Sequence, residues 1–389
     1  MPRRMRNGNM LLIIKCPKEM ILTAKIRKCF LFYLVPIQVE SLQTYGLVTA
    51  FFDDHDEPLT IRSPLVEDEM AADIFELLSS EQFEVYFFDE HNRELLGYRV
   101  RNKKAANFKL ISSTIHLASP DKFLEYDHLT GWFDDQMSRW FGNRTSADDD
   151  MAFSIDFDEA LFPDNLFIQD ARPTVNSYHG CKVPMHTSLE RQDAGHFSEL
   201  DVVNALLRVF ESEQIYLNPI RPDDGREFAD ILVTTSQKLY LIQVKDSPNT
   251  EAVLDRSIDR KKATALSHLK KAVAQMRGSI SYTRSCVPLE IVVDNERHEI
   301  PLGNRDVIGL IIIKELFSDE FAVYSPLAFQ LFSETGVPCL ILDYPQFHAY
   351  TLNRRTEESF IQTFEQVFAV ALKEKEFPRL RFWTQLMPK

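Results

Sequence analysis

Apolar and polar residues alternate along the chain with two different periods, and the period predicts the secondary structure of each stretch. In the N-terminal half, short apolar runs with many aromatic and β-branched residues predict strands, and apolar residues spaced by three and four predict a helix. The predicted strands are 31–39, 46–52, 84–88 and 95–100, and the predicted helix is 68–78. This mixture indicates a small α+β accessory or sensor domain over residues 29–142.

The C-terminal half begins with an amphipathic helix predicted over residues 199–213, for which Ser198 is a candidate N-cap. The apolar stripe of this helix contains Val203, Leu206 and Phe210, and Glu199 stands at its head, four residues before Val203. A carboxylate on an apolar face is seldom ordinary solvated charge. We therefore expect Glu199 to face the interior.

A β-hairpin is predicted between Asp230 and Lys245, where two apolar runs flank a polar turn. If Ser236-Gln237 forms the loop, Asp230 lies opposite Gln243. If the loop is one residue later, Asp230 lies opposite Lys245. Gln243 and Lys245 are two residues apart and share a face of the sheet. Either register brings an acid, an amide and an amine to one end of the sheet.

The remaining pattern predicts that helices flank a mixed central sheet. The second strand of the hairpin is apolar on both faces from Leu239 to Ile242, so a layer is expected on each side. Such an α/β arrangement is a common layered architecture. The further predicted elements are helix 252–280, strands 289–293 and 307–314, helix 326–334, strand 339–342 and helix 357–374.

Charge is distributed unevenly along the 389 residues, whose formal net charge is −14. Residues 51–100 hold fourteen acids and three bases, whereas residues 256–284 hold eight bases and one acid. The basic segment directly follows the hairpin, where a nucleic-acid backbone would need positive charge. The acidity of the whole chain therefore does not exclude a nucleic-acid partner.

Composition also suggests the domain limits. The basic stretch 1–28 differs from the rest of the chain and is predicted to be a flexible arm. Residues 143–190, which include three consecutive aspartates and several prolines, are predicted to be an acidic linker. Residues 191–389 then form the second domain.

Cysteine usage and hydropathy indicate a cytoplasmic protein. The five cysteines are scattered and form no CxxC pair, which favours reduced thiols over disulfides or a zinc site. The longest apolar run, Cys29 to Ile37, is far shorter than a membrane span. No membrane association is expected.

The motif in the C-terminal half resembles that of the PD-(D/E)xK nuclease superfamily. Glu199 lies in a first helix, Asp230 begins one strand, and Gln243-Val244-Lys245 ends the next. The glutamine form is similar to the Mrr-like branch of restriction endonucleases. The resemblance covers about residues 190–345 and implies a restriction-endonuclease-like core. Ala229 stands where the family has proline, and Gln243 replaces the usual acid.

This resemblance implies a magnesium or manganese site. Asp230 would be the principal ligand, assisted by the Gln243 side-chain oxygen and the Val244 carbonyl. Lys245 would orient the attacking water or stabilise negative charge in the transition state. Glu199 would hold an outer-sphere water or a second ion. With glutamine in place of an acid, metal binding is expected to be weaker than at an all-carboxylate site.

The long predicted helix after the hairpin is the expected nucleic-acid contact. Several of its polar residues lie on a face different from its apolar stripe, and the resemblance implies that Gln275 lies beside the substrate. The candidate nucleic-acid-binding residues are Lys261, Lys262, His268, Lys270, Lys271, Gln275 and Arg277.

These features and the resemblance together predict a metal-dependent endonuclease that hydrolyses DNA. The resemblance implies that it acts in a prokaryotic restriction or anti-phage defence system. The N-terminal domain would contact a second copy of the chain or a partner protein of that system. RNA cleavage is an alternative, because the same metal chemistry supports it. A protein that keeps the nuclease fold for nucleic-acid binding or assembly, without catalysis, is the alternative from another class.

Overall fold

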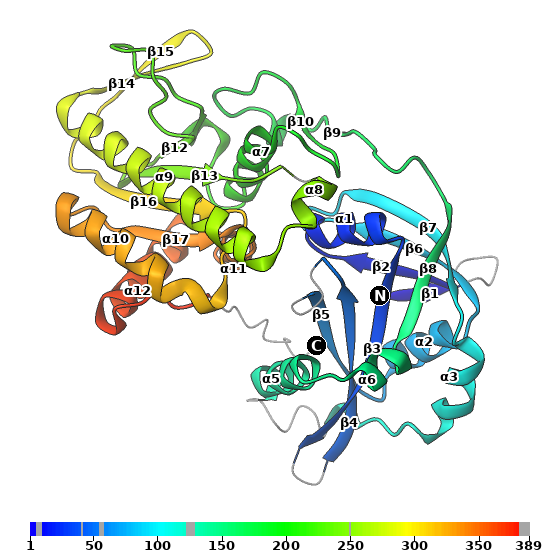
Figure 1. The fold of residues 1–389 in the computed structure, drawn as a ribbon. Coiled ribbons are helices and arrows are strands. Elements are labelled where there is room, and N and C mark those ends of the chain that lie inside the picture. The colour runs from blue at the N-terminus through cyan, green and yellow to red at the C-terminus, as the bar shows by residue number, and fades with distance from the viewer. Residues whose placement is uncertain (5–9, 40–41, 54–57, 122–128, 249, 381–389) are drawn as a thin grey trace. The chain divides into compact units, whose positions relative to one another are not determined.

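Two compact units make up the protein in the computed structural model (Figure 1). The structure describes residues 1–4, 10–39, 42–53, 58–121, 129–248 and 250–380. Unit 1 comprises residues 1–166, 188–190 and 249–255. Unit 2 comprises residues 167–187, 191–248 and 256–389.

Unit 1 is built on an eight-stranded sheet in the order β1-β2-β6-β7-β8-β3-β4-β5. Strands β2 and β6 are parallel, and the other neighbouring pairs are antiparallel. Its strands are β1 (Pro2–Arg4), β2 (Met10–Lys15), β3 (Cys29–Val39), β4 (Leu42–Phe51), β5 (Leu59–Leu65), β6 (Gln82–Phe88), β7 (Glu94–Asn102) and β8 (Phe153–Ala160). Its helices are α1 (Lys18–Arg27), α2 (Glu69–Leu78), α3 (Ala105–Ile111), α5 (Leu129–Gly142), α6 (Ser146–Met151) and α8 (Glu251–Leu254).

Two of the predicted domain limits are wrong. The expected arm over residues 1–28 contains β2, which pairs with strands on both sides, and α1, in which Ile21 and Leu22 are fully buried. The expected linker over 143–190 contains β8, which lies between β7 and β3. Both predictions rested on the average charge of a long segment, which does not show the alternation of apolar residues within it. In β2, for example, the alternate residues Met10, Leu12 and Ile14 are buried.

Unit 2 contains a five-stranded mixed sheet in the order β11-β12-β13-β16-β17. Strands β11, β12 and β13 are antiparallel, whereas β13, β16 and β17 run parallel. The sheet strands are β11 (Ile215–Leu217), β12 (Ile231–Thr234), β13 (Lys238–Lys245), β16 (Asp306–Ile313) and β17 (Cys339–Asp343). Two smaller pairs are β9 (Ile168–Asp170) with β10 (Met185–Thr187), and β14 (Leu289–Val293) with β15 (Glu296–Ile300).

Helices cover both faces of this sheet. On one face, Gln243 of β13 contacts Ser279 of α9, and α10 packs beside α9 (Figure 1). On the other face, the Tyr240 ring packs against Phe210 and Phe360. The mixed sheet with a layer on each side, expected from the apolar β13 sequence, is therefore present. The helices of unit 2 are α7 (Ala194–Leu206), α9 (Ile258–Ser285), α10 (Phe321–Thr335), α11 (Tyr344–Asn353) and α12 (Glu357–Glu374).

Several predicted helix limits need correction: α7 ends at Leu206 instead of residue 213, and α10 begins at Phe321 instead of residue 326. Helix α7 begins at Ala194, with Asp193 at the N-cap position, so Ser198 lies within the helix and does not cap it. The helix predicted over 252–280 is divided into α8 and α9 by residues 255–257. A periodic apolar pattern marks which face is buried but does not register a short interruption of the backbone. No helix in the described ranges is both long enough and apolar enough to cross a membrane.

Candidate active site

The hairpin adopts the first of the two predicted registers. Ile231 pairs with Ile242, and the Thr235 amide donates to the Lys238 carbonyl, so Ser236-Gln237 forms the loop. Continuing this register by one residue places Asp230 opposite Gln243. The acid, the amide and the amine therefore lie at the end of β13 that is remote from the turn.

Asp230 is the centre of a compact hydrogen-bonded group. The residue as a whole is only 2% exposed. The Val244 amide donates to Asp230 Oδ2 at 2.5 Å, and Lys245 Nζ donates to the same oxygen at 2.8 Å. Lys245 Nζ also lies 2.9 Å from the Val244 carbonyl oxygen. A buried carboxylate requires such donors, because an unpaired charge in the interior is strongly unfavourable.

Glu199 is connected to this group through Asn218. The backbone N–H of Asn218 donates to the backbone carbonyl oxygen of Asp230 at 2.9 Å. The side-chain Nδ2 of Asn218 donates to Glu199 Oε2 at 3.1 Å. Asn218 has φ of 51°, a left-handed conformation that asparagine tolerates better than most residues. Burial and the Asp230 carboxylate raise the pKa of Glu199 to about 7, although the Asn218 hydrogen bond opposes them. Glu199 can therefore exchange a proton near neutral pH.

Gln243 is buried on the face covered by α9. Its Nε2 lies 3.5 Å from Ser279 Oγ, and Ser279 in turn donates to the Phe228 carbonyl. Gln243 Oε1 is buried without a hydrogen-bond partner among the described residues. An unpaired buried acceptor costs free energy, so this oxygen is suited to a ligand.

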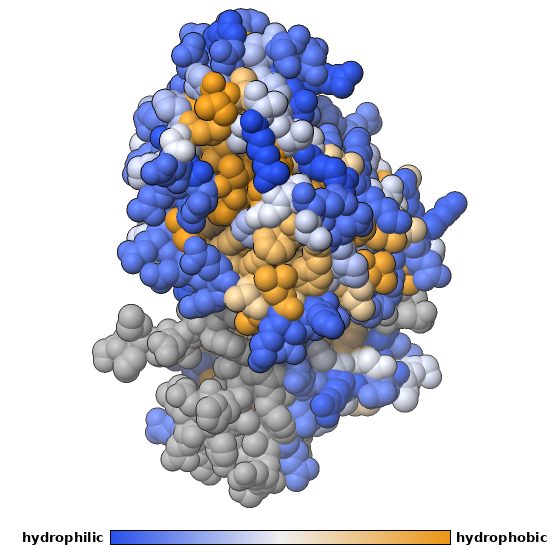
Figure 2. Space-filling model, turned by 90° about the vertical axis from the view of Figure 1, so that its left-hand side faces the viewer, coloured by the Kyte–Doolittle hydropathy of each residue, from blue (hydrophilic) through white to orange (hydrophobic). Residues whose placement is uncertain are grey.

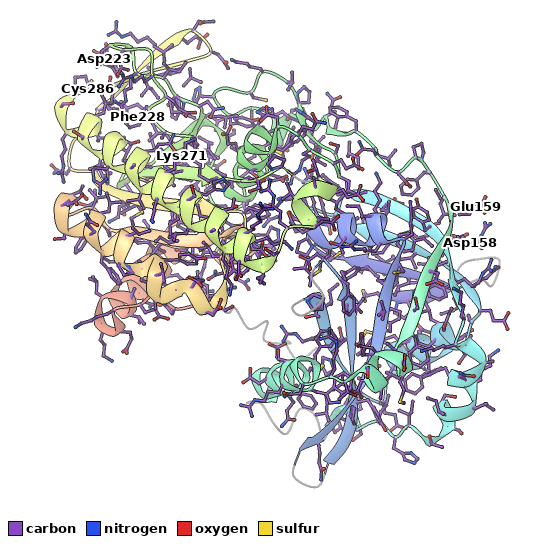
Figure 3. All side chains as sticks on the ribbon, in the orientation of Figure 1. Asp158, Glu159, Asp223, Phe228, Lys271 and Cys286 are labelled. Atoms are coloured by element: carbon purple, nitrogen blue, oxygen red, sulfur yellow. The ribbon has the colours of Figure 1, made fainter. Side chains whose placement is uncertain are left out.

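The candidate residues of α9 fall into two groups. Lys271, labelled in Figure 3, is exposed and acts electrostatically on Glu227 and on His268. Burial lowers the pKa of His268, against the opposing effect of Asp246. The side chains predicted for nucleic-acid contact on this flank of α9 therefore reach the surroundings of Asp230.

Other members of that set lie elsewhere or are already paired. Lys262 forms an ion pair with Asp319, and Arg277 forms one with Glu334 at 2.7 Å. Lys270 is exposed, Lys261 is half-buried, and Gln275 is half-buried with its Oε1 unpaired in the described part of the chain. Pairing reduces the positive charge that Lys262 and Arg277 can offer to a phosphate backbone.

The sequence pattern did not reveal Asn218, Glu227 or Ser279. Asn218 precedes Pro219, a dipeptide that marks a turn, but a turn signal does not disclose which carboxylate the side chain holds. Partial desolvation and the Asp230 carboxylate raise the pKa of Glu227, which places a further acid beside the group. Ser279 lies on the buried face of α9, where the apolar pattern predicts packing contacts only.

The oxygen atoms of this group fit a hard divalent cation. Both hydrogen bonds to the Asp230 side chain end on Oδ2, and Oδ1 accepts none from the described residues. Gln243 Oε1 is the second unsatisfied oxygen, and carboxylate and amide oxygens are ligands that Mg²⁺ accepts. The described residues contain no group of three or more His, Cys, Asp or Glu that could hold a metal. The donor set is therefore one carboxylate and one amide, with Glu199 nearby.

No model of a known protein family matches the chain, and no curated protein sequence matches it significantly. A function for unit 2 must therefore be argued from the group around Asp230 itself. That group combines the Asp230 carboxylate, a Gln243 side-chain oxygen that is unpaired among the described residues, a lysine, and a carboxylate, Glu199, whose pKa is raised to about 7.

Proposed function

We propose that unit 2 is a metal-dependent nuclease that hydrolyses phosphodiester bonds in DNA on a restriction-endonuclease-like core. The observation that supports this most strongly is the convergence of three side chains. Asp230 and Lys245 meet directly, and Glu199 reaches them through Asn218. Their order along the chain and their places on a helix and two strands are those implied by the PD-(D/E)xK resemblance.

The metal would be held by Asp230 Oδ1 and Gln243 Oε1, which accept no hydrogen bond from the described residues. When bound, Mg²⁺ or Mn²⁺ polarises a phosphate oxygen and lowers the pKa of water. A site with one carboxylate and one amide is expected to bind the cation weakly. The Val244 carbonyl oxygen, which was also predicted to be a ligand, already accepts a hydrogen bond from Lys245.

Lys245 and Glu199 have complementary chemical roles. Lys245 Nζ lies 2.8 Å from the proposed metal ligand, so its charge stabilises negative charge that develops on a phosphate bound there. Glu199, with a pKa raised to about 7, accepts a proton from water most effectively at and above neutral pH. This role as a general base replaces the outer-sphere role inferred from the motif alone.

The basic flank of α9 supports a nucleic-acid substrate. Lys271 is exposed and acts electrostatically on Glu227, an acid beside Asp230, so a phosphate backbone that follows this flank approaches the site. Within a restriction or anti-phage system, unit 1 would serve as the sensor, and would contact a second copy of the chain or a partner protein.

A second function is favoured by one specific observation. Lys245 already neutralises Asp230, and no three-residue metal group is found in the described parts of the chain. A chain that has kept this arrangement for stability, while binding nucleic acid without cutting it, would look the same. Cleavage assays separate the two functions.

The decisive experiment incubates the full chain with plasmid, linear, nicked and single-stranded DNA and with RNA, in Mg²⁺, Mn²⁺ or EDTA. A nuclease cuts in the metals and not in EDTA, and the preferred substrate decides between DNA and RNA. Lys245→Met should abolish cutting, whereas Lys373→Met, an exposed control on α12, should not. Binding without cutting in every condition would support the non-catalytic function.

A further inference from the structure

A pocket lies at the opposite end of the unit 2 sheet from Asp230. It is formed where β13, β16 and β17 begin and has a volume of about 380 Å³. Lys238 lines this pocket and Lys245 belongs to the candidate active site, so the two sites are about 23 Å apart along β13. We call it the turn-end pocket. Its volume is within the range of small-molecule sites, roughly 300–1,000 Å³.

The floor of the turn-end pocket is apolar. It is formed by side chains from three different elements and the loop before β17, among them Ile280, Ile308, Val337 and Ile361. Figure 2 looks onto this end of unit 2 and shows apolar surface framed by hydrophilic side chains. An apolar floor of this size stabilises a flat organic body, such as a nucleobase, by removing it from water.

The rim of the pocket carries uncompensated positive charge. Arg284 donates to the Thr335 carbonyl and Arg305 to the Pro301 carbonyl, and neither has an acidic partner among the described residues. Arg305 Nε has no hydrogen-bond partner in that part of the chain. The two acids that line the pocket, Asp306 and Glu365, both contact Lys238 instead.

Two arginines that, among the described residues, donate only to backbone carbonyls can bind an anion. A guanidinium donates in a planar fork that matches the oxygens of a phosphate, and such charge-assisted hydrogen bonds are the strong ones. A ligand with an apolar body and one phosphate satisfies the floor and the rim together.

We propose that the turn-end pocket binds a nucleoside 5′-phosphate, with the base on the apolar floor and the phosphate between Arg284 and Arg305. The same group is found on a free mononucleotide and at the 5′ end of a nucleic-acid strand. The proposal is independent of nuclease activity, because it uses none of the residues around Asp230.

Calorimetric titration of the full chain with AMP in EDTA tests the proposal, since EDTA removes metal from the candidate active site. AMP should bind, and adenosine and inorganic phosphate should each bind at least about tenfold more weakly, since each lacks half of the contacts. Arg284→Gln and Arg305→Gln should each weaken AMP binding by about tenfold. Arg260→Gln, an exposed control on α9 outside the pocket, should not change it.

A 5′-phosphorylated dinucleotide identifies the source of the group. Tighter binding of the dinucleotide than of AMP, with the same dependence on Arg284 and Arg305, assigns the pocket to a strand end; the reverse order assigns it to a free nucleotide. Equal affinity for AMP and adenosine, binding unchanged in both arginine variants, or no binding of AMP at about 1 mM would each overturn the proposal.

Discussion

At the scale of single residues, the ion pair between Asp230 and Lys245 determines what the site can do. Both side chains are largely buried, with exposed fractions of 3% and 14%, so each charge depends on the other. A cation at Asp230 would have the lysine as a close neighbour of like charge. The ion pair therefore keeps the Asp230 carboxylate in position, but the lysine charge should lower the affinity of that carboxylate for a metal ion.

Replacement of the two partners should have opposite effects on metal binding. Asp230→Asn should abolish both cleavage and Mn²⁺ binding, because it removes the central anionic ligand. Lys245→Met should abolish cleavage but leave Mn²⁺ binding equal or tighter, because a nearby positive charge is lost. Titration calorimetry with Mn²⁺, beside a cleavage assay, measures both. Full activity of Lys245→Met would contradict the role given to the lysine.

Glu199 should make both activity and stability depend on pH. Its pKa is raised from 4.5 to about 7, so cleavage should increase as pH rises through about 7, where the carboxylate becomes able to accept a proton. Burial of the ionised form opposes folding, and the native state binds the proton more tightly than the unfolded chain. The free energy of unfolding should therefore decrease as pH rises from about 4.5 to about 7.

The variant Glu199→Gln tests this assignment in metal-free buffer. In this buffer it should be more stable than the parent protein at pH 8 and close to it in stability at pH 4.5, and with Mg²⁺ added it should not cleave DNA. Urea unfolding at the two pH values measures the difference. A variant that is less stable than the parent at pH 8 would show that burial of the ionised carboxylate does not destabilise the folded protein.

At the scale of elements, α9 combines a structural face with a binding flank. Leu269, Ala272 and Met276 are buried against the sheet, whereas Lys271 is exposed and acts electrostatically on Glu227. Arg277, on the same helix, is held in an ion pair by Glu334. The charge of Arg277 is therefore compensated by an ion pair, whereas Lys271 has no ion pair with an acid among the described residues and its charge would be available to a nucleic acid.

This difference predicts unequal effects on DNA binding. Lys271→Gln should weaken binding and reduce the slope of log affinity against log salt by about one, because one phosphate contact is lost. Arg277→Gln should change both quantities less, because its charge is already compensated. Fluorescence anisotropy over a salt series measures the slopes. Equal losses in the two variants would indicate a diffuse charge effect instead of a defined contact.

At the scale of the whole molecule, each unit has its own buried core. Leu96 in β7 and Leu310 in β16 are both fully buried strand leucines, one in each unit. Replacement of such a leucine by alanine costs about 2–5 kcal/mol. Because two separate cores can unfold separately, we expect two calorimetric transitions, of which Leu96→Ala lowers one and Leu310→Ala the other. A single transition lowered by both variants would contradict this.

What the sequence alone determined is local. The apolar periodicity predicted β3, β13 and α12, and the limits of α12 were predicted to the residue, because burial of one face imposes a period that neighbouring positions share. The turn allowed two hairpin registers, and the orientation of Glu199 could be inferred from four residues of one helix. Average charge over a long stretch was a poor guide, since it concealed β2 and β8.

Only the tertiary structure decided which distant groups meet. The pairing of β12 with β13 shows which of the two registers is adopted, and the link from Glu199 to Asp230 runs through Asn218, whose backbone is left-handed. The same holds for Arg277, whose ion-pair partner is 57 residues away, and for the turn-end pocket, which several elements form together. Hydrogen bonds and ion pairs of this kind act over a few ångströms in space, and no periodic pattern in the chain encodes them.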